Sequence, residues 1–249
     1  MLDFNMNCKS RSCKDNLKME LRLAPSWRAS KQNGKKISII IPSFNVATTI
    51  TGVVNEFIDL VDEVIVVNNN SRDDTKKQAT RTRAKVIDCK TQGMGYAIKE
   101  GLKVAKNDLI IKIDGDIRNP NKNWIEKLES KFQNGYLFVN SIYSSDYDEF
   151  PVGTLTARPA LKVLFPELEY VKIPLSGTYI FDRTKLNWND LRGDWSFDLG
   201  LLMDAHFKGS TIGQVEIGYL NDSQKKISEY HEMAVEIFAY LIKLKFLHE

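Results

Sequence analysis

The chain has 249 residues, of which 43% are hydrophobic and 27% charged, proportions typical of a soluble globular protein with a sizeable core. No apolar run approaches the ~20 residues of a membrane span. The N-terminus also lacks the apolar region of a signal peptide, so we expect a cytoplasmic protein. Three cysteines, Cys8, Cys13 and Cys89, have neither the count of a disulfide framework nor metal-ligand spacing, which favours free thiols.

Charge is distributed unevenly along the chain. Residues 1–36 hold nine Lys or Arg against three Asp or Glu, a net charge of +6, so the remainder holds 26 against 29, or −3. A basic arm can tether nucleic acid or a membrane surface. Here the basic residues are scattered among polar ones without interleaved aromatics, which favours a solvated, partly disordered lead-in over residues 1–35. We therefore expect no nucleic-acid partner.

Apolar strands and amphipathic helices alternate between residues 37 and 116. The sequence predicts strands at 37–41, 64–67, 85–87 and 109–113, and helices at 50–61, from 73 onward, and at 97–105. This alternation builds a parallel sheet with right-handed crossovers, so the predicted fold class is α/β. Gly93 and Gly95 lack the third glycine of a dinucleotide fingerprint and follow the third strand, which excludes a Rossmann dehydrogenase.

The predicted buried strand Leu109–Ile113 ends in the acidic turn Asp114-Gly115-Asp116. Ligands of open α/β sheets bind in the crevice beyond the carboxyl ends of the strands. Two carboxylates at that edge suit a hard divalent cation that carries a substrate diphosphate. The alternative is an Asp-Gly turn whose acids are only solvated.

Past residue 120 the pattern is less regular. The sequence predicts helices at 124–132, 158–164 and 197–207. It predicts strands at 136–143 and 211–219, a further strand that ends at 181, and a polar, proline-containing loop at 146–153. Apolar residues at helical spacing over 227–242 predict a long amphipathic helix. Such a stripe is typical of a core face or a dimer seam. Because Phe238, Leu241 and Phe246 are more apolar than a rim requires, we expect a homodimer.

Four motifs together resemble those of the GT-A glycosyltransferases in order and spacing. They are 36–45 (KISIIIPSFN), 62–75 (DEVIVVNNNSRDDT), 93–97 (GMGYA) and 114–116 (DGD). The resemblance implies that the first three surround a nucleotide, while the Asp-x-Asp holds a divalent cation on the diphosphate of a sugar donor. The implied fold is an α/β GT-A domain with a mixed sheet. It would have a Rossmann-like nucleotide-sugar-binding half at 36–120 and an acceptor-binding half at 121–249.

Motifs in the second half are similar to those of the retaining glucosyl-3-phosphoglycerate synthases. They are 157–161 (ARPAL), 164–168 (LFPEL), 174–177 (PLSG), 198–204 (DLGLLMD) and 214–218 (QVEIG). The resemblance implies a metal-dependent hexosyl transfer, with retention, from a nucleotide diphosphate sugar to a small hydroxylated acid. It also points to a homodimer.

The resemblance implies roles for individual residues. Donor binding falls to Pro42, Asn45, Asn68, Ser71, Gly93, Met94, Gly95, Asp114 and Gly115, and the amides of the glycine turn would approach the phosphates closely. Acceptor binding falls to Gly153, Arg158, Ser176, Gly177 and Asp198. The metal ligands would be Asp116 and Asp222, holding Mg²⁺ or Mn²⁺ as a Lewis acid, and the catalytic residues Asp114 and Asp198. A turn role is the alternative for Asn45 and Asn68, as is a structural ion pair for Arg158.

Several positions depart from the family pattern. Val46 replaces an acid near the base, Met94 a lysine near the diphosphate, and Asp198 a longer glutamate that faces the acceptor. A basic acceptor-phosphate loop aligns with 150–153, and a metal-binding histidine with Asp222. Two alternatives therefore stay open: a glycosyltransferase with a glycan or lipid-linked acceptor, and a sugar-nucleotide-binding protein without catalysis. The sequence names neither the sugar, the base nor the acceptor.

Overall fold

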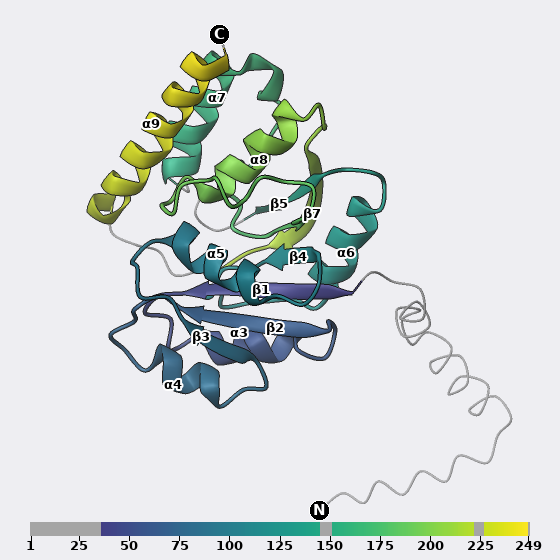
Figure 1. The fold of residues 1–249 in the computed structure, drawn as a ribbon, viewed down its shortest axis with the longest axis vertical. Coiled ribbons are helices and arrows are strands. Elements are labelled where there is room, and N and C mark those ends of the chain that lie inside the picture. The colour runs from purple at the N-terminus through teal and green to yellow at the C-terminus, as the bar shows by residue number, and fades with distance from the viewer. Residues whose placement is uncertain (1–35, 145–150, 222–226, 249) are drawn as a thin grey trace, which may run out of the picture. The chain divides into compact units, whose positions relative to one another are not determined.

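The computed structural model describes residues 36–144, 151–221 and 227–248, all within one compact unit. Within these ranges the centre is a seven-stranded sheet in the order β3-β2-β1-β4-β6-β5-β7 (Figure 1). The strands are β1 Ile37–Ser43, β2 Glu63–Asn68, β3 Lys85–Asp88, β4 Leu109–Lys112, β5 Phe138–Ser144, β6 Tyr179–Asp182 and β7 Gly213–Tyr219. The predicted lead-in at 1–35 lies outside the described residues.

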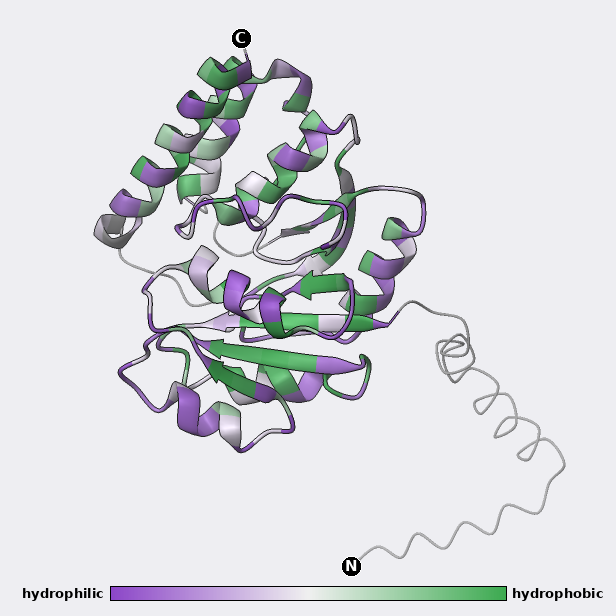
Figure 2. Cartoon of the chain, in the orientation of Figure 1, coloured by the Kyte–Doolittle hydropathy of each residue, from purple (hydrophilic) through white to green (hydrophobic). Residues whose placement is uncertain are grey.

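Helices cover both faces of this sheet. Figure 2 shows mostly hydrophobic strands between helices that have both hydrophilic and hydrophobic residues. The helices are α3 Ile50–Phe57, α4 Thr75–Thr80, α5 Met94–Val104, α6 Asn123–Phe132, α7 Arg158–Leu164, α8 Phe197–Phe207 and α9 His231–His248. Shorter helical segments are η1 Gly153–Ala157, η2 Pro166–Leu168 and η3 Ile227–Tyr230. The predicted helices at 124–132, 158–164 and 197–207 are confirmed.

The sheet is parallel in its first half and mixed overall. Strand β1 pairs in parallel with β2 and β4, so that Ile40 lies opposite Ile65 on one side and Lys112 on the other. Strand β3 continues this parallel set beside β2. Strand β6 is antiparallel to both β4 and β5. The predicted parallel alternation and the mixed α/β sheet are therefore both confirmed.

Strand β1 contributes to a separate hydrophobic core on each face of the sheet, because successive side chains of a strand point to opposite faces. Ile40 packs in the cluster built with α5 and α8, whereas Ile39 and Ile41 pack in the cluster built with α3 and α6. All three side chains are fully buried. Burial on both faces explains why this strand reads as an unbroken apolar run.

The structure corrects the predicted elements at three places. The helix predicted at 50–61 ends at Phe57. The segment predicted as a loop at 146–153 is helical where it is described, since η1 runs directly into α7. Proline and glycine there suggested a loop, but Pro151 and Gly153 are both helical. Helix α9 continues to His248, past the predicted end at 242.

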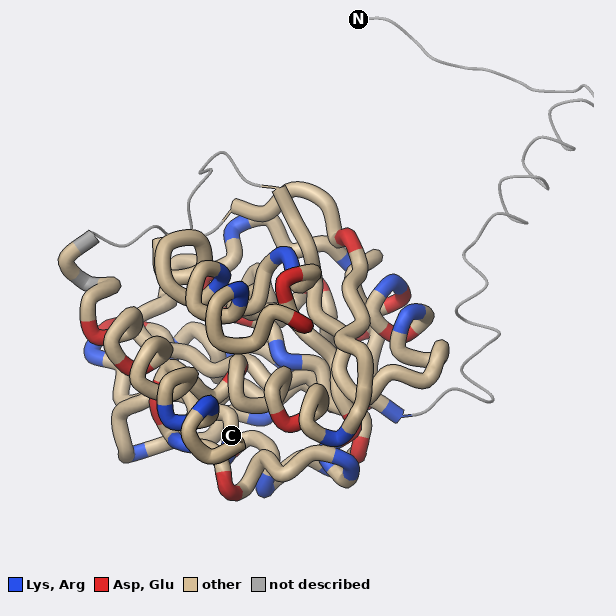
Figure 3. The backbone as a smooth tube through the Cα atoms, turned by 90° about the horizontal axis from the view of Figure 1, so that it is seen from above, with Lys and Arg blue, Asp and Glu red and all other residues tan. Residues whose placement is uncertain are grey.

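Three further observations concern membrane spans, surface charge and cysteines among the described residues. None of their helices is both long and apolar enough to cross a membrane. Basic and acidic residues are interspersed along the backbone (Figure 3). Cys89 is a buried free thiol, as predicted, while Cys8 and Cys13 lie outside the described ranges.

Candidate active site

A cleft of about 570 Å³ opens beyond the carboxyl ends of β1 and β4, where the sequence placed a ligand site. The structure brings most of the predicted site residues to it. Those in its lining are Pro42, Gly93, Met94, Asp114, Gly115, Asp116, Ser176, Gly177 and Asp198. The lining therefore combines residues from both predicted halves of the chain.

The acidic turn Asp114–Asp116 is held between the end of β1 and the start of α3. The hydroxyl of Thr49 donates to the carbonyl oxygen of Gly115 (2.7 Å). A Cβ built on Gly115 would lie 3.0 Å from Ser43 Oγ. This close approach favours glycine, and it fixes the two carboxylates on either side of it relative to the sheet.

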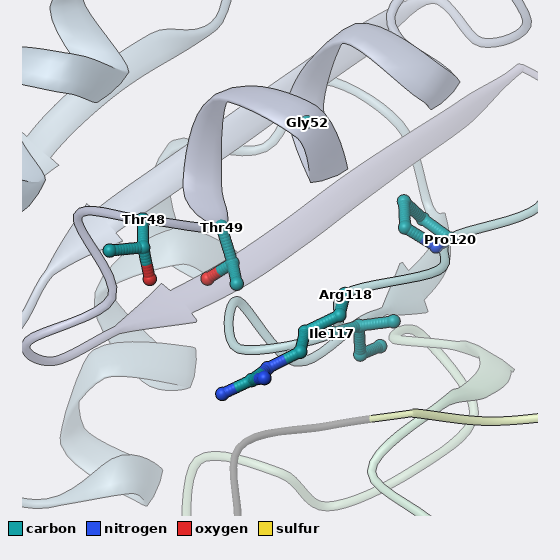
Figure 4. A pocket seen from close by; sticks show the side chains of 6 residues that line it. All are labelled: Thr48, Thr49, Gly52, Ile117, Arg118 and Pro120. Carbon is teal, nitrogen blue, oxygen red and sulfur yellow. The ribbon is translucent and has the colours of Figure 1, made fainter.

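A smaller hollow of about 410 Å³ lies beside the acidic turn and shares Ile117 with the cleft. Figure 4 shows the side chains of Thr48 and Thr49 at the N-terminal end of α3, with the Arg118 side chain extending beneath them. Arg118 is exposed, and its backbone N–H donates to the carbonyl oxygen of Asn221 (2.8 Å). This hydrogen bond ties the segment after the acidic turn to the end of β7.

Lys112 is a buried cation beneath the cleft, and sequence reasoning missed it. Its Nζ lies 2.6 Å from Asp114 Oδ1 and 2.9 Å from Asp198 Oδ2. Loss of hydration favours the neutral amine, but these two carboxylates outweigh it and raise the pKa of Lys112 above its usual value. A lysine inside the apolar run 109–113 was the available signal, because lysine is almost never fully buried unless it is paired.

Asp198 belongs to this charge cluster rather than to an open acceptor surface. One carboxylate oxygen contacts Lys112, and the other accepts a hydrogen bond from the Tyr179 hydroxyl (2.7 Å). Burial and the adjacent Asp198 raise the pKa of Tyr179 well above its usual value, so the phenol stays protonated and donates. The Asp198 side chain is only 6% exposed but belongs to the cleft lining, so its contact with an acceptor stays a prediction.

Asp114 stands at the exposed end of the cluster, with 36% of its side chain accessible. Loss of hydration raises the pKa of Asp114, the ammonium of Lys112 lowers it, and the carboxylates of Asp116 and Asp198 raise it again, to about 6 overall. One of its oxygens faces Lys112, and the other faces Gly177.

Three predicted donor-binding residues form a hydrogen-bonded rim outside the cleft lining. The Arg72 N–H donates to Asn45 Oδ1 (2.8 Å), and the Asn45 N–H donates to Ser71 Oγ (3.1 Å). Asn68 donates from Nδ2 to Asp88 Oδ1 (2.9 Å) at the ends of β2 and β3. Asn45 has a φ of 54°, a conformation that asparagine tolerates in turns. The structure thus favours the turn alternative for Asn45, whereas Asn68 is the last residue of β2.

The glycine turn at 93–95 serves packing in this structure. The Gly93 N–H donates to Asn69 Oδ1 (2.9 Å), and the Gly95 N–H donates to the Asp194 carbonyl oxygen (3.3 Å). A Cβ built on Gly95 would lie 2.7 Å from the Arg192 carbonyl oxygen. The expectation that these two amides face a phosphate is therefore not met, because both already donate within the chain. Asn69, which sequence reasoning missed, lines the cleft and holds this turn.

The predicted acceptor residues divide into two groups. Ser176 and Gly177 line the cleft, whereas Gly153 is buried within η1 and Arg158 is exposed on α7, both outside the described lining. Sequence analysis overlooked three aromatic residues of the wall, Tyr143, Trp195 and Tyr230. They come from three separate elements, so no local motif indicates them. Asp222, the predicted second metal ligand, lies outside the described residues.

The acidic turn suits a hard divalent cation that is shared with a substrate. Among the described residues, no three His, Cys, Asp or Glu side chains gather into a complete metal site. Carboxylate oxygens are ligands that Mg²⁺ and Mn²⁺ prefer. Mg²⁺ commonly takes only one or two protein carboxylates, together with substrate phosphates and water. Asp116 therefore fits a cation whose coordination a diphosphate would complete.

A mixed α/β sheet with an acidic turn at the carboxyl edge of its central strands is the architecture of a nucleotide-dependent glycosyltransferase. The sequence profile of glycosyl transferase family 2 matches residues 38–188, which is more than half of the chain. The chain therefore belongs to glycosyl transferase family 2. The predicted fold class and enzyme class are confirmed by this match.

Similar proteins include the glucosyl-3-phosphoglycerate synthase of Mycobacterium tuberculosis strain H37Rv, 28% identical over 88% of this chain and 77% of the relative. A crystal structure of that synthase from M. tuberculosis, in complex with Mn²⁺, UDP-glucose and phosphoglyceric acid, has a TM-score of 0.80 and 29% identity, covering 88% of this chain and 82% of that one. A second structure, with Mg²⁺ and UDP, has a TM-score of 0.79 at the same identity and coverages. The resemblance seen in the sequence is thus confirmed.

Proposed function

We propose that the protein is a metal-dependent glycosyltransferase that moves a sugar from a nucleotide diphosphate sugar to a small hydroxylated acid, with retention at the anomeric carbon. The observation that carries the proposal is the Asp114–Asp116 turn in a cleft of a chain that is similar, at a TM-score of 0.80, to a synthase crystallised with Mn²⁺, UDP-glucose and phosphoglyceric acid. UDP-glucose and 3-phosphoglycerate are therefore the first substrates to test.

In this proposal some residues of the cleft bind the cation and others bind the donor. Asp116 holds Mg²⁺ or Mn²⁺, with Asp222 as a second ligand, and the cation when bound stabilises negative charge on the departing diphosphate. Asp114 accepts a hydrogen bond from a hydroxyl of the sugar or ribose. Pro42 and Met94 form walls beside the donor. Residues 36–120 thus supply most of the donor site.

The acceptor side of the proposal rests on residues 121–249. Ser176 and Gly177 bring this half of the chain to the cleft. Asp198 contributes through the charge cluster, since both of its carboxylate oxygens have partners there. Arg158, exposed on α7, is a poor candidate for pairing with an acceptor held in the described cleft. The identity of the acid is therefore the part of the proposal that most needs measurement.

A matrix of donors and acceptors tests the proposal. Purified protein with Mn²⁺ would be given UDP-, GDP- and ADP-glucose in turn, each with 3-phosphoglycerate, with a lipid-linked or glycan acceptor, or alone, and released nucleotide would be quantified. We expect release with one donor that depends on the phosphoacid, and NMR of the product should show the donor's anomeric configuration. Release only with a glycan or lipid-linked acceptor would replace the acceptor assignment. Nucleotide binding without release under any condition would favour the non-catalytic alternative.

We also propose that two chains associate through α9 and that the protein acts in the cytoplasm. Helix α9 buries Ile237 and Leu241 against the protein but leaves Val235, Phe238 and Phe246 exposed. Contiguous exposed apolar surface on a soluble protein commonly marks an interaction site. The family resemblance supports a homodimer as the assembly.

A further inference from the structure

Lys112 carries a buried charge that the stability of the fold does not explain. It lies in the central strand β4 next to Ile111 and Ile113, and its side chain is fully buried. Removing an ammonium and its partner carboxylates from water costs free energy that their attraction often fails to repay. Well-packed hydrophobic residues at such positions are frequently neutral or stabilising. A role in the cleft therefore accounts for a lysine at this position better than fold stability does.

The buried ammonium joins three elements into one line of charged hydrogen bonds. The Tyr179 hydroxyl from β6 holds one oxygen of Asp198 on α8, and the other oxygen holds Lys112 on β4. Lys112 in turn holds Oδ1 of Asp114. Asp198, Lys112 and Asp114 all line the cleft, and Asp114 has the most exposed side chain of the three. Charge-assisted hydrogen bonds of this kind are short and directional. The orientation of the Asp114 carboxylate is therefore set from beneath.

We propose that Lys112 is a positioning residue whose ammonium, anchored by Asp198, holds the Asp114 carboxylate in the orientation that receives the donor sugar. This inference rests on the proposed function, because it assigns Asp114 to a donor. It also gives Asp198 a different task from the one expected from the sequence. Asp198 acts through Lys112, and Tyr179 fixes Asp198, so neither needs to touch the acceptor.

Position 94 is close enough to Lys112 for a lysine there to place an ammonium beside the same carboxylates. Its Sδ lies 3.9 Å from Lys112 Nζ, and it is the first residue of α5. Methionine and lysine are both unbranched and similar in length, so exchanging them conserves volume. In the double exchange Lys112→Met/Met94→Lys, the ammonium would start from position 94 and reach the same two carboxylates. The double exchange therefore tests whether the site needs only the positive charge or needs a lysine at position 112 of β4.

The central experiment compares the parent, Lys112→Met and the double exchange. For each we would measure kcat, KM for the donor, and the folded fraction from a thermal unfolding curve. We expect Lys112→Met to lower kcat/KM for the donor per folded molecule by about 100-fold, the size expected when a reacting group is misplaced by about 1 Å. The double exchange should restore the folded fraction to that of the parent and recover part of the kcat/KM that Lys112→Met loses. Parent-like activity of folded Lys112→Met would overturn the proposal, and so would an exchange that restores stability but no activity.

A double-mutant cycle tests the role given to Asp198. Lys112→Met/Asp198→Asn removes one cation and one anion together, so the net charge of the cluster stays at that of the parent and folding is protected. If Asp198 acts through Lys112, the double variant should lose no more activity than Lys112→Met alone, and KM for the acceptor should not change. Losses that multiply, together with a raised KM for the acceptor, would show that Asp198 works independently.

Crystal structures of the parent and of Lys112→Met/Asp198→Asn test the inference independently of any activity assay. We expect the Asp114 carboxylate to rotate away from its parent orientation in the double variant. An unchanged Asp114 would overturn the inference even in an inactive protein. A parent that releases nucleotide from no donor would instead count against the proposed function, so the two failures are distinguishable.

Discussion

The carboxylate of Asp114 occupies the space in which residue 177 would otherwise carry a side chain, since a Cβ built on Gly177 would lie 1.9 Å from Asp114 Oδ2. Gly177 also has a φ of 72°, in the left-handed region that favours glycine. The contact brings the segment before β6 against the turn after β4, where these antiparallel neighbours meet the cleft. Space and conformation both select glycine at this position.

Gly177→Ala should therefore damage the site more than the fold. The new methyl group must push the Asp114 carboxylate aside, and we expect kcat/KM to fall by about 100-fold. Alanine in the left-handed region should cost about 1 to 2 kcal/mol of unfolding free energy. The matched control is Gly209→Ala, which has a similar φ of 77° but no atom within 4 Å of its Cβ. Equal losses of activity in the two variants would contradict this reading of Gly177.

Asp116→Ala should abolish transfer and leave the fold intact, because it removes the proposed cation ligand from a turn at the sheet edge. Binding of UDP with Mn²⁺, measured by calorimetry, should weaken far more than binding of uridine, since only the diphosphate shares the cation. Residual activity within tenfold of the parent would remove Asp116 from the metal site. Asp59→Ala, at an exposed ion pair with Arg83, is the control for loss of a surface carboxylate.

Two glycines in the first turns of helices α3 and α5 should respond oppositely to alanine. A Cβ on Gly95 would lie 2.7 Å from the Arg192 carbonyl oxygen and 2.8 Å from Phe197 Cβ, so Gly95→Ala should lower the thermal midpoint. Gly52 in α3 has no atom within 4 Å of its Cβ. Gly52→Ala should therefore raise stability by about 0.5 to 1 kcal/mol, the usual helix preference for alanine. Scanning calorimetry of both variants checks the pair, and a stabilised Gly95→Ala would refute the packing role.

The exposed apolar face of α9 predicts a dimer in solution. Light scattering at micromolar concentration should report twice the mass of the 28.5 kDa chain. Phe238→Glu should shift the protein to a monomer, because it places a charge among exposed apolar residues. Lys243→Glu, which changes the charge of the same helix at an exposed polar position, should remain dimeric. A monomeric parent would refute the prediction.

Asp222 stays a prediction, since it lies outside the described residues. A carboxylate favours Mg²⁺ and Mn²⁺, whereas an imidazole suits borderline transition metals. The parent should therefore accept Mg²⁺ more readily than Asp222→His does, which activity measured across a metal series would reveal. If Asp222→Ala kept the metal profile of the parent, Asp116 would be the only supported protein ligand.

The elements nearest the cleft could be predicted because local patterns determine them. The apolar run before Asp114 indicates a strand buried on both faces, and the acids after it indicate a site at the sheet edge. The same reasoning counted Lys112 as one residue of that strand and gave it no role. Its partner Asp198 is distant in sequence, so only the fold reveals that the two are paired.

The glycine turn shows a different limit of sequence reasoning. Gly93 and Gly95 were predicted as a turn before a helix at 97–105, whereas α5 begins at Met94 and includes Gly95. The ligand of their amides was expected to be a phosphate. The structure places the Asn69 side-chain oxygen at the Gly93 amide. At the Gly95 amide it places the Asp194 carbonyl, from a segment nearly one hundred positions later in the chain. Glycine signals close approach of some atom, and no local pattern identifies which one. Gly153 and Arg158 are absent from the described cleft lining even though the helix at 158–164 was predicted, because a local pattern does not show which residues of distant elements meet.

The hydrogen bonds that occupy the start of α5 also bear on the order in which ligands arrive. The amides of Gly93 and Gly95 already donate to Asn69 and to Asp194, so they are withheld from the phosphates of a donor. Attraction for the diphosphate then depends largely on a cation at Asp116. Nucleotide and metal ion should accordingly bind as one unit, and the apparent affinity for UDP should rise in proportion to free Mn²⁺ until the metal saturates.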